Sequence, residues 1–193
     1  MFRMAFVAAA ALAAARQKPG SVAIGSVGTG SLGHLAMAQV NSLQKVDITH
    51  VPYKGGGPLM IDAVGNQVPL AIGTVFLVTP HVKGGKLKAL AVTSDKPSPQ
   101  LPGVATVAEQ GVPGFSALAW WGVIAPAGTP PAIVKRMHEE LARALKAPAV
   151  AEKLSAQGMD IVGGGPEELD RFLRAEIGRW AKVVKENGVK AGD

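Results

Sequence analysis

The sequence predicts an α/β fold built around a parallel sheet. Over roughly the first 120 residues, short apolar stretches alternate with stretches of helical pattern, which is typical of βαβ units. One of these stretches, 87–94, is almost wholly apolar, as strands buried on both faces of a parallel sheet are. The 24 glycines and 14 prolines among 193 residues fit many tight turns, and a hydrophobic content of 48% can supply a core.

The expected elements of this first part follow one another closely. They are a strand at 21–26, a helix at 31–43, a strand at 46–53, a glycine turn and short helix within 55–67, a strand at 68–75, a helix at 76–82 and a strand at 87–94. Four prolines then predict a surface loop over 95–115 that holds one short helix, 104–110.

After a last strand the pattern becomes mainly helical. The predicted elements are a strand at 116–126, a helix capped by Thr129 with Pro130 in its first position, a helix from Pro148 to Gly158, a short strand at 159–164, and a long helix that opens at Gly165-Pro166 and closes at Asn187-Gly188. The long helix carries an apolar stripe that is expected to pack in a core: Leu169, Phe172, Leu173, Ile177, Trp180 and Val184.

These helices need a sheet to cover, and the sequence supplies only fragments of one. We therefore expect one fairly complete domain at 21–120. Residues 121–193 are expected to be the helical part of a second domain whose other strands are missing.

The N-terminal residues 1–20 allow two interpretations. Arg3 is followed by an apolar run from Met4 to Ala15 and by small residues, as in a short secretory signal. The same residues also describe an alanine-rich helix that Pro19-Gly20 stops. The run is too short to span a bilayer.

Composition disfavours several functional classes. The absence of cysteine excludes disulfides, thiolate zinc sites and cysteine nucleophiles. The four histidines have no metal-binding spacing, so no metal site is predicted. The net charge of +6 is not concentrated in any basic run, and no RNP or zinc-finger pattern accompanies it. Nucleic-acid binding is therefore not expected.

A glycine-rich loop, "GSVGTGSLGHLA", is the main functional feature. Gly28, Gly30 and Gly33 have the spacing G-x-G-x-x-G between a strand and a helix. Amide N–H groups and the helix dipole at such a turn favour an anion. A dinucleotide would also require an acid at the end of the second strand. Asp47 instead precedes that strand, so a nucleotide-binding oxidoreductase is only an alternative.

A serine hydrolase is a second alternative. "TGSLG" resembles a nucleophile elbow around Ser31, with Thr29 in place of the first glycine. Asp95 and His138 are the acid and histidine that follow in order, and nothing near them supports a triad. His34 could touch Ser31, but no residue is visible that would orient it. No catalytic residue is predicted.

The third interpretation is a binding site for a small carboxylate. "VPYKGGGP", at 51–58, is a second glycine-rich loop at the carboxyl end of a strand. Neighbouring parallel strands place such loops side by side, where α/β proteins bind ligands. Hydroxyl groups would add to this polar cradle; they belong to Ser26, Thr29, Ser31, Tyr53 and Thr74.

A series of motifs in unbroken order resembles a known family. The motifs are "GSVGTGSLGHLA", "HVPYKGGGP", "GKLKALAVTS", "VATVAEQGVPGF", "WWGVIAPAGTP" and "EIGRWAKVVKENGVK". They resemble the tripartite tricarboxylate transporter substrate-binding proteins, also known as the Bug or TctC family. The resemblance covers about residues 5 to 190.

The resemblance implies a periplasmic solute receptor of type II periplasmic-binding-protein architecture, with two α/β domains that close on a small carboxylic acid. Such a receptor is not an enzyme, needs no cofactor or metal, and passes its ligand to membrane transporter subunits. Carried over to this chain, the ligand-binding residues would be Ser26, Gly28, Thr29, Gly30, Ser31, His34, Tyr53, Lys54, Gly55 and Thr74.

The resemblance also bears on the N-terminus. Members of the family begin with a signal peptide, a first strand and a proline- and glycine-rich loop that supplies the other half of the site. The alanine-rich segment 1–20 resembles the family helix that comes after these parts. The resemblance therefore implies an N-terminally truncated receptor of a periplasmic family, whose ligand is a small carboxylate.

Overall fold

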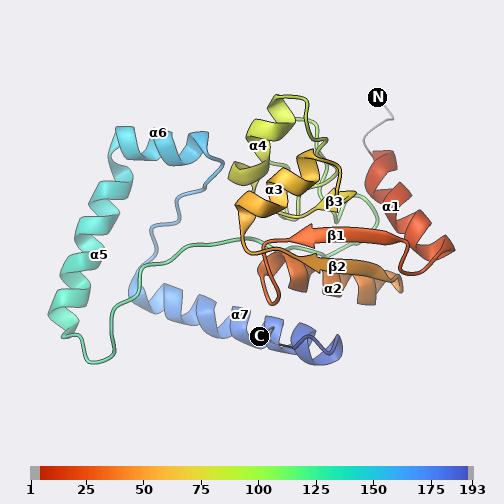
Figure 1. Cartoon of the computed structure of the whole chain (residues 1–193). Helices are drawn as coiled ribbons and strands as arrows, with labels where there is room; N and C mark the ends of the chain where they lie inside the picture. The colour runs from red at the N-terminus through yellow and green to blue at the C-terminus, as the bar shows by residue number, and fades with distance from the viewer. Residues whose placement is uncertain (1–4, 191–193) are drawn as a thin grey trace. The chain divides into compact units, whose positions relative to one another are not determined.

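The computed structural model describes residues 5–190 (Figure 1). Arg3 and the start of the expected 1–20 segment lie outside the described residues, as does the end of the predicted 121–193 domain. The chain forms two compact units, which are described separately. One unit comprises the chain through Ala119 together with the residues from Lys182 onward, and the other comprises Trp120–Ala181.

A three-stranded parallel sheet organises the first unit. β1 (Val22–Ser26) lies in the centre, between β2 (Ile48–Pro52) and β3 (Leu70–Ala71). Ser26 is aligned with Pro52 of β2, and Gly25 with Ala71 of β3. The carboxyl ends of the three strands therefore meet at one edge of the sheet.

Helices cover both faces of this sheet. α2 (Leu32–Gln44) lies on one face, and α3 (Gly56–Val64) and α4 (Val75–Lys83) lie on the other (Figure 1). α1 (Ala5–Gln17) joins α2 over a cluster formed by Ala15, Met37 and Ile48. The parallel α/β class is confirmed, and residues 5–17 are helical.

Two elements predicted between β3 and residue 119 are wrong. The apolar stretch 87–94 forms no strand, and Val92 makes only an isolated bridge to Thr106. β3 is two residues long, shorter than the predicted 68–75, so it offers little edge for another strand. The predicted helix 104–110 is a series of turns, in which Thr106 and Glu109 bond each other's backbone N–H groups at 3.1 and 2.8 Å as in an isolated capping box.

Irregular chain still contributes a core here. Val92, Leu101 and Val104 form a buried cluster against the apolar side of α4. The Gln110 side chain donates to the Leu90 carbonyl at 2.8 Å and thereby holds the 87–94 segment. A side chain thus takes the place of the strand ladder that the apolar pattern predicts.

The second unit contains helices and extended chain. α5 (Pro131–Lys146), α6 (Pro148–Ala156) and α7 (Pro166–Glu186) appear as predicted, and α7 continues into the first unit. The predicted strands 116–126 and 159–164 are not formed, because no strand among the described residues pairs with them. Thr129 does not cap α5; its hydroxyl donates to the Pro126 carbonyl at 2.8 Å, and Pro130 occupies the cap position.

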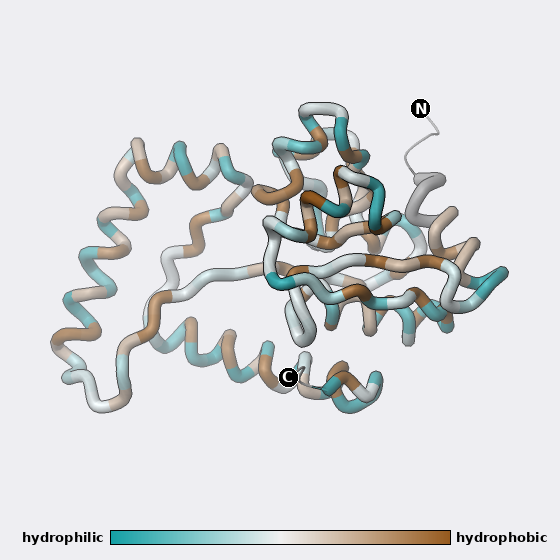
Figure 2. Tube along the Cα trace, viewed as in Figure 1, coloured by the Kyte–Doolittle hydropathy of each residue, from teal (hydrophilic) through white to brown (hydrophobic). Residues whose placement is uncertain are grey.

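The expected core of the second unit is absent from the described part of the chain. Across residues 120–181 no residue is buried, and Phe172 and Ile177 of the predicted stripe are exposed. Hydrophobic and hydrophilic residues both recur along α5 (Figure 2), and none of the residues of α5 is buried. Within residues 5–190, no helix combines the length and the apolar content that crossing a membrane requires.

Candidate functional site

Three helices of the first unit begin at the carboxyl edge of the sheet. β1 leads into α2, β2 into α3, and β3 into α4, each through a short loop. A helix start presents N–H groups that have no partner inside the helix, and it carries a partial positive charge. The edge therefore collects three such starts, and this arrangement favours an anion.

The loop between β1 and α2 has several open N–H groups. Ser31 is the N-cap of α2, and its side chain accepts a hydrogen bond from the His34 N–H at 3.4 Å. Among the described residues, the N–H groups of Thr29, Leu32 and Gly33 have no acceptor. Gly30 has a φ of 74°, which a residue with a side chain rarely adopts.

The loop after β2 runs beside the first. The Tyr53 N–H donates to the Ser26 carbonyl at 3.0 Å, and the Gly55 N–H donates to the Val27 carbonyl at 3.2 Å. Gly55 is the N-cap of α3 and supplies no side chain to fill the cap. Within the described chain, the N–H groups of Gly56 and Gly57 have no acceptor.

The third loop completes the edge. The Ile72 N–H donates to the Gly25 carbonyl at 2.9 Å, which ties the chain after β3 to β1. Gly33 allows α2 to approach this chain, since a Cβ atom there would lie 2.9 Å from Ile72 Cγ2. Thr74 is the N-cap of α4, and its side chain makes no cap hydrogen bond.

The structure brings the predicted site residues to this one edge of the first unit. It places them at the end of β1, in the three loops and in the first turn of α2: Ser26, Gly28, Thr29, Gly30, Ser31, His34, Tyr53, Lys54, Gly55 and Thr74. Lys54 is exposed. The Tyr53 hydroxyl donates to Asp62 at 3.0 Å, so in this structure Tyr53 lines the edge through its backbone. Direct ligand contact by these residues remains a prediction.

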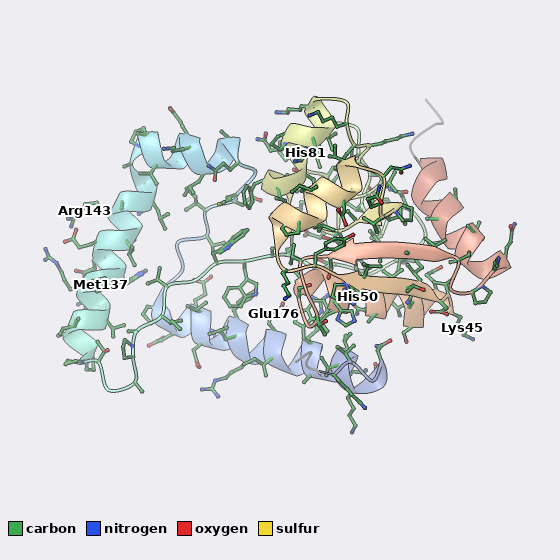
Figure 3. The ribbon with its side chains drawn as sticks, viewed as in Figure 1. Lys45, His50, His81, Met137, Arg143 and Glu176 are labelled. Atoms are coloured by element: carbon green, nitrogen blue, oxygen red, sulfur yellow. The ribbon has the colours of Figure 1, made fainter. Side chains whose placement is uncertain are left out.

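A histidine pair behind the first loop was missed from the sequence. The rings of His34, on α2, and His50, on β2, are stacked with centroids 3.8 Å apart and 7° between their planes. His50 lies on the side of the sheet that α2 covers (Figure 3). Its Nε2 is 2.6 Å from Ser26 Oγ, and His34 Nδ1 accepts the Gly30 N–H at 3.1 Å. The alternation of β2, which puts His50 on the same face as buried Ile48, was the available signal.

Burial lowers the pKa of both histidines. The pKa of His50 falls to about 4, because burial disfavours its charged form and His34 adds repulsion. Burial likewise lowers the pKa of His34 from its ordinary value. Both rings are therefore neutral at pH 7.

Neither enzyme alternative gains support from this geometry. Asp47 lies at the amino end of β2, on the opposite edge from the glycine loop, so it cannot hold a ribose there. Ser31 meets His34 through a backbone N–H, not through the ring. Ser26 does bond a histidine nitrogen, but its side chain is fully buried and out of reach of a substrate.

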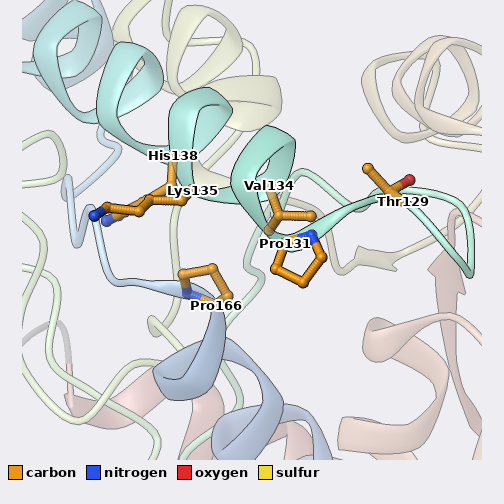
Figure 4. A pocket seen from close by; sticks show the side chains of 6 residues that line it. All are labelled: Thr129, Pro131, Val134, Lys135, His138 and Pro166. Carbon is orange, nitrogen blue, oxygen red and sulfur yellow. The ribbon is translucent and has the colours of Figure 1, made fainter.

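A hollow lies in the other unit, away from the loops of the sheet edge in the sequence. It has a volume of about 410 Å³ and is lined by Thr129, Pro131, Val134, Lys135, His138 and Pro166 (Figure 4). Its walls are mainly apolar and do not resemble the amide-rich sheet edge. In the part of the chain that the structure describes, no group of three or more histidine or acidic side chains is placed to hold a metal ion.

The fold is that of an α/β protein in which three helix starts meet at one edge of a parallel sheet, an arrangement that favours an anion. The family model described as "Tripartite tricarboxylate transporter family receptor" matches residues 8–189, and the chain belongs to this family. This confirms the predicted family resemblance, and the fold agrees with the solved members.

The sequence relatives include two bacterial proteins that are identical to this chain at a similar share of positions. One, from Pseudomonas sp. strain P51, is described as the UPF0065 protein in the tcbD-tcbE intergenic region and is 40% identical over 93% of this chain. Protein BugT of Bordetella pertussis is 38% identical over 94% of this chain. The chain spans about half the length of these curated relatives, 54% and 56%.

Solved structures give the same result. Rpa4515 of R. palustris, solved with adipate, has a TM-score of 0.86 and 37% identity. MatC of Rhodopseudomonas palustris, solved with bound malate, has a TM-score of 0.75 and 31% identity. The likeness covers 94% and 90% of this chain, and 60% of each of the two solved chains.

Proposed function

We propose that this chain is the ligand-binding part of a solute receptor for a small organic acid. The open N–H groups at three converging helix starts carry the proposal, since they can receive a carboxylate without any fixed counter-charge. Family membership supports it, because the family is one of transporter receptors. In this role the protein binds and releases its ligand and performs no chemistry.

We propose a dicarboxylate as the ligand class. Relatives solved with adipate and malate support this choice. One carboxylate would accept hydrogen bonds from the Thr29, Leu32 and Gly33 N–H groups, and the Thr74 hydroxyl would donate from the facing loop. Lys54 would attract the anion from solvent without a buried ion pair.

The cellular setting is proposed on the same basis. The solved relative BugD is described as a periplasmic binding protein, and the family works with a tripartite transporter. We infer that this protein is likewise periplasmic and delivers its acid to membrane transporter subunits.

We further propose that residues 121–193 belong to a second domain that more of the polypeptide completes. Val162 is 82% exposed and Ile124 is 81% exposed, and no residue in 120–181 is buried. A unit with this much exposed apolar surface needs a partner layer. The covered share of the solved relatives, 60%, leaves room for such a layer.

Calorimetric titration tests the binding proposal directly. Succinate, adipate, malate and citrate are titrated into the full chain, with dimethyl adipate as the uncharged control. We expect at least one acid to bind and the ester to give no heat. Binding of NAD with none of any acid would overturn the proposal.

A further inference from the structure

Two stacked imidazoles lie behind the β1–α2 loop; one bonds to the loop itself and the other to the last residue of β1, just before the loop. His34 Nδ1 accepts the N–H of Gly30, and His50 Nε2 meets the hydroxyl of Ser26. No hydrogen bond from either ring goes elsewhere among the described residues. The pair therefore acts on the loop that carries the open N–H groups.

The hydrogen bonds around the Ser26 hydroxyl indicate which groups donate and which accept. A serine hydroxyl has one proton and two lone pairs. The Gly28 N–H at 3.2 Å and the Ser31 hydroxyl at 3.3 Å both donate to Ser26 Oγ and occupy its lone pairs. The Ser26 proton has two acceptors within reach, His50 Nε2 at 2.6 Å and the Gly28 carbonyl at 3.0 Å, and we assign it to the nearer one, His50 Nε2. His50 is thereby an acceptor at Nε2.

Both rings must be neutral for these bonds to exist. His34 accepts at Nδ1 and carries its proton on Nε2, while His50 accepts at Nε2 and carries its proton on Nδ1. Protonation of His34 turns its accepting Nδ1 into a donor that faces the Gly30 N–H. Protonation of His50 puts a proton on Nε2, so that the Ser26 hydroxyl can no longer donate to it. Two charged rings with centroids 3.8 Å apart would also repel each other.

We propose that His34 and His50 are positioning residues that hold the 27–31 loop in its anion-binding form only while both rings are neutral. The inference rests on the proposed carboxylate function for its binding readout. Neither histidine needs to touch the ligand; each acts through Gly30 or Ser26. Acid then weakens binding by loosening the loop.

Among the described residues, no charged side chain forms a hydrogen bond or ion pair with either ring. β1 and α2 have no charged residue. The charged side chains on or beside the other elements of this unit that adjoin the α2 side of the sheet are Arg16 of α1, Lys45 after α2, Asp47 and Lys54 on either side of β2, and Lys182, Lys185 and Glu186 at the end of α7. The response to pH therefore belongs to the two histidines themselves.

Substitutions separate the acceptor from the titrating ring. His34→Asn and His50→Gln place an amide oxygen near the accepting nitrogen but cannot be protonated in this range. His34→Phe and His50→Phe keep a ring and remove the acceptor. His81→Phe, on α4, is the matched control because it lies outside the pair.

Adipate affinity from pH 7.5 to 4.0, corrected for the protonation of adipate's own carboxyl groups, provides the binding readout. We expect the affinity of the natural chain to weaken by roughly 3- to 10-fold on acidification, as for the loss of one or two net hydrogen bonds. The Asn and Gln variants should lose most of the pH response, whatever their affinity at pH 7.5, and the Phe variants should bind more weakly than His81→Phe at every pH. Binding that strengthens in acid, or Phe variants that match the control, would overturn the proposal.

Hydrogen exchange of the Gly30 amide, measured without ligand, keeps the two proposals apart. Exchange should quicken in acid, after correction for its intrinsic pH dependence, in the natural chain but not in His34→Asn. If no acid binds at any pH, the proposed function fails while this measurement still decides the positioning role. Unchanged Gly30 protection in His34→Phe would contradict it.

Discussion

The side-chain hydroxyl of Thr74 can contribute to ligand binding without being needed for folding. It caps α4 by its backbone conformation, with a ψ of 151°, yet its side chain makes no cap hydrogen bond. No partner for its hydroxyl is found among the described residues. The hydroxyl is therefore available to a ligand at no cost to the fold.

Replacing Thr74 by valine tests this availability. Thr74→Val keeps the shape and removes the donor, so we expect carboxylate affinity to fall about 10-fold, as for a lost hydrogen bond to a charged group. Thermal stability should stay within a degree or two. Thr49→Val, at the amino edge of β2, is the matched control and should leave affinity unchanged. Equal affinities of the two variants would exclude Thr74 from the site.

The contact between Ser26 and His50 could not be predicted from the sequence. The two residues lie 24 positions apart, and their meeting depends on the register that aligns β1 with β2. The pattern G-x-G-x-x-G identified the loop because it is local. The ring that supports the loop from the neighbouring strand has no local signature.

At the scale of elements, the starts of α2, α3 and α4 determine the chemistry of the site. Each follows a parallel strand, so strand order alone brings them together. These βα units were predictable because each carries its own turn signal, such as Gly55-Gly56 before α3. The strands expected at 87–94, 116–126 and 159–164 do not form. An apolar run becomes a strand only where another strand lies beside it to pair with, and the sequence does not show whether one does.

Ser31 allows the start of α2 to be tested as a cap and as an anion site separately. Ser31→Asp keeps a good N-cap residue and adds a negative charge, so we expect stability to be retained and carboxylate affinity to fall more than about 10-fold. Ser31→Ala should lose about 1 kcal/mol of unfolding free energy.

Calorimetry and urea unfolding check both expectations for Ser31. Ser21→Asp, which adds the same charge at the amino edge of β1, serves as the control and should bind normally. Unimpaired binding by Ser31→Asp would show that the anion does not sit at the start of α2.

At the scale of the whole molecule, the two units differ in kind. The first has buried clusters on both sides of its sheet, while residues 120–181 have no buried residue. The apolar stripe of α7 predicted a core, but no residue of that stripe is buried among the described residues. The hydrophobic periodicity of a helix identifies its apolar face, but it does not show which part of the protein packs against that face.

Completion of this second domain can be measured by hydrogen exchange. We expect amides in 120–126 and 159–164 to exchange rapidly in the present chain, because no strand pairs with them. The chain can be extended at its N-terminus with the residues of Rpa4515 that come before the matched region. This extension should slow the exchange of these amides by about 100-fold or more. The amides of β1 serve as an internal reference. Exchange that is equally fast in the extended chain would contradict the proposed domain.

Backbone-amide NMR during a titration with adipate tests the central claim most directly. The account predicts that the largest shifts fall on the open N–H groups at the sheet edge: Thr29, Leu32, Gly33, Gly56 and Gly57. Dimethyl adipate should leave these signals in place. Saturable shifts centred on the 410 Å³ hollow near His138, or no shifts with any dicarboxylate, would contradict the account.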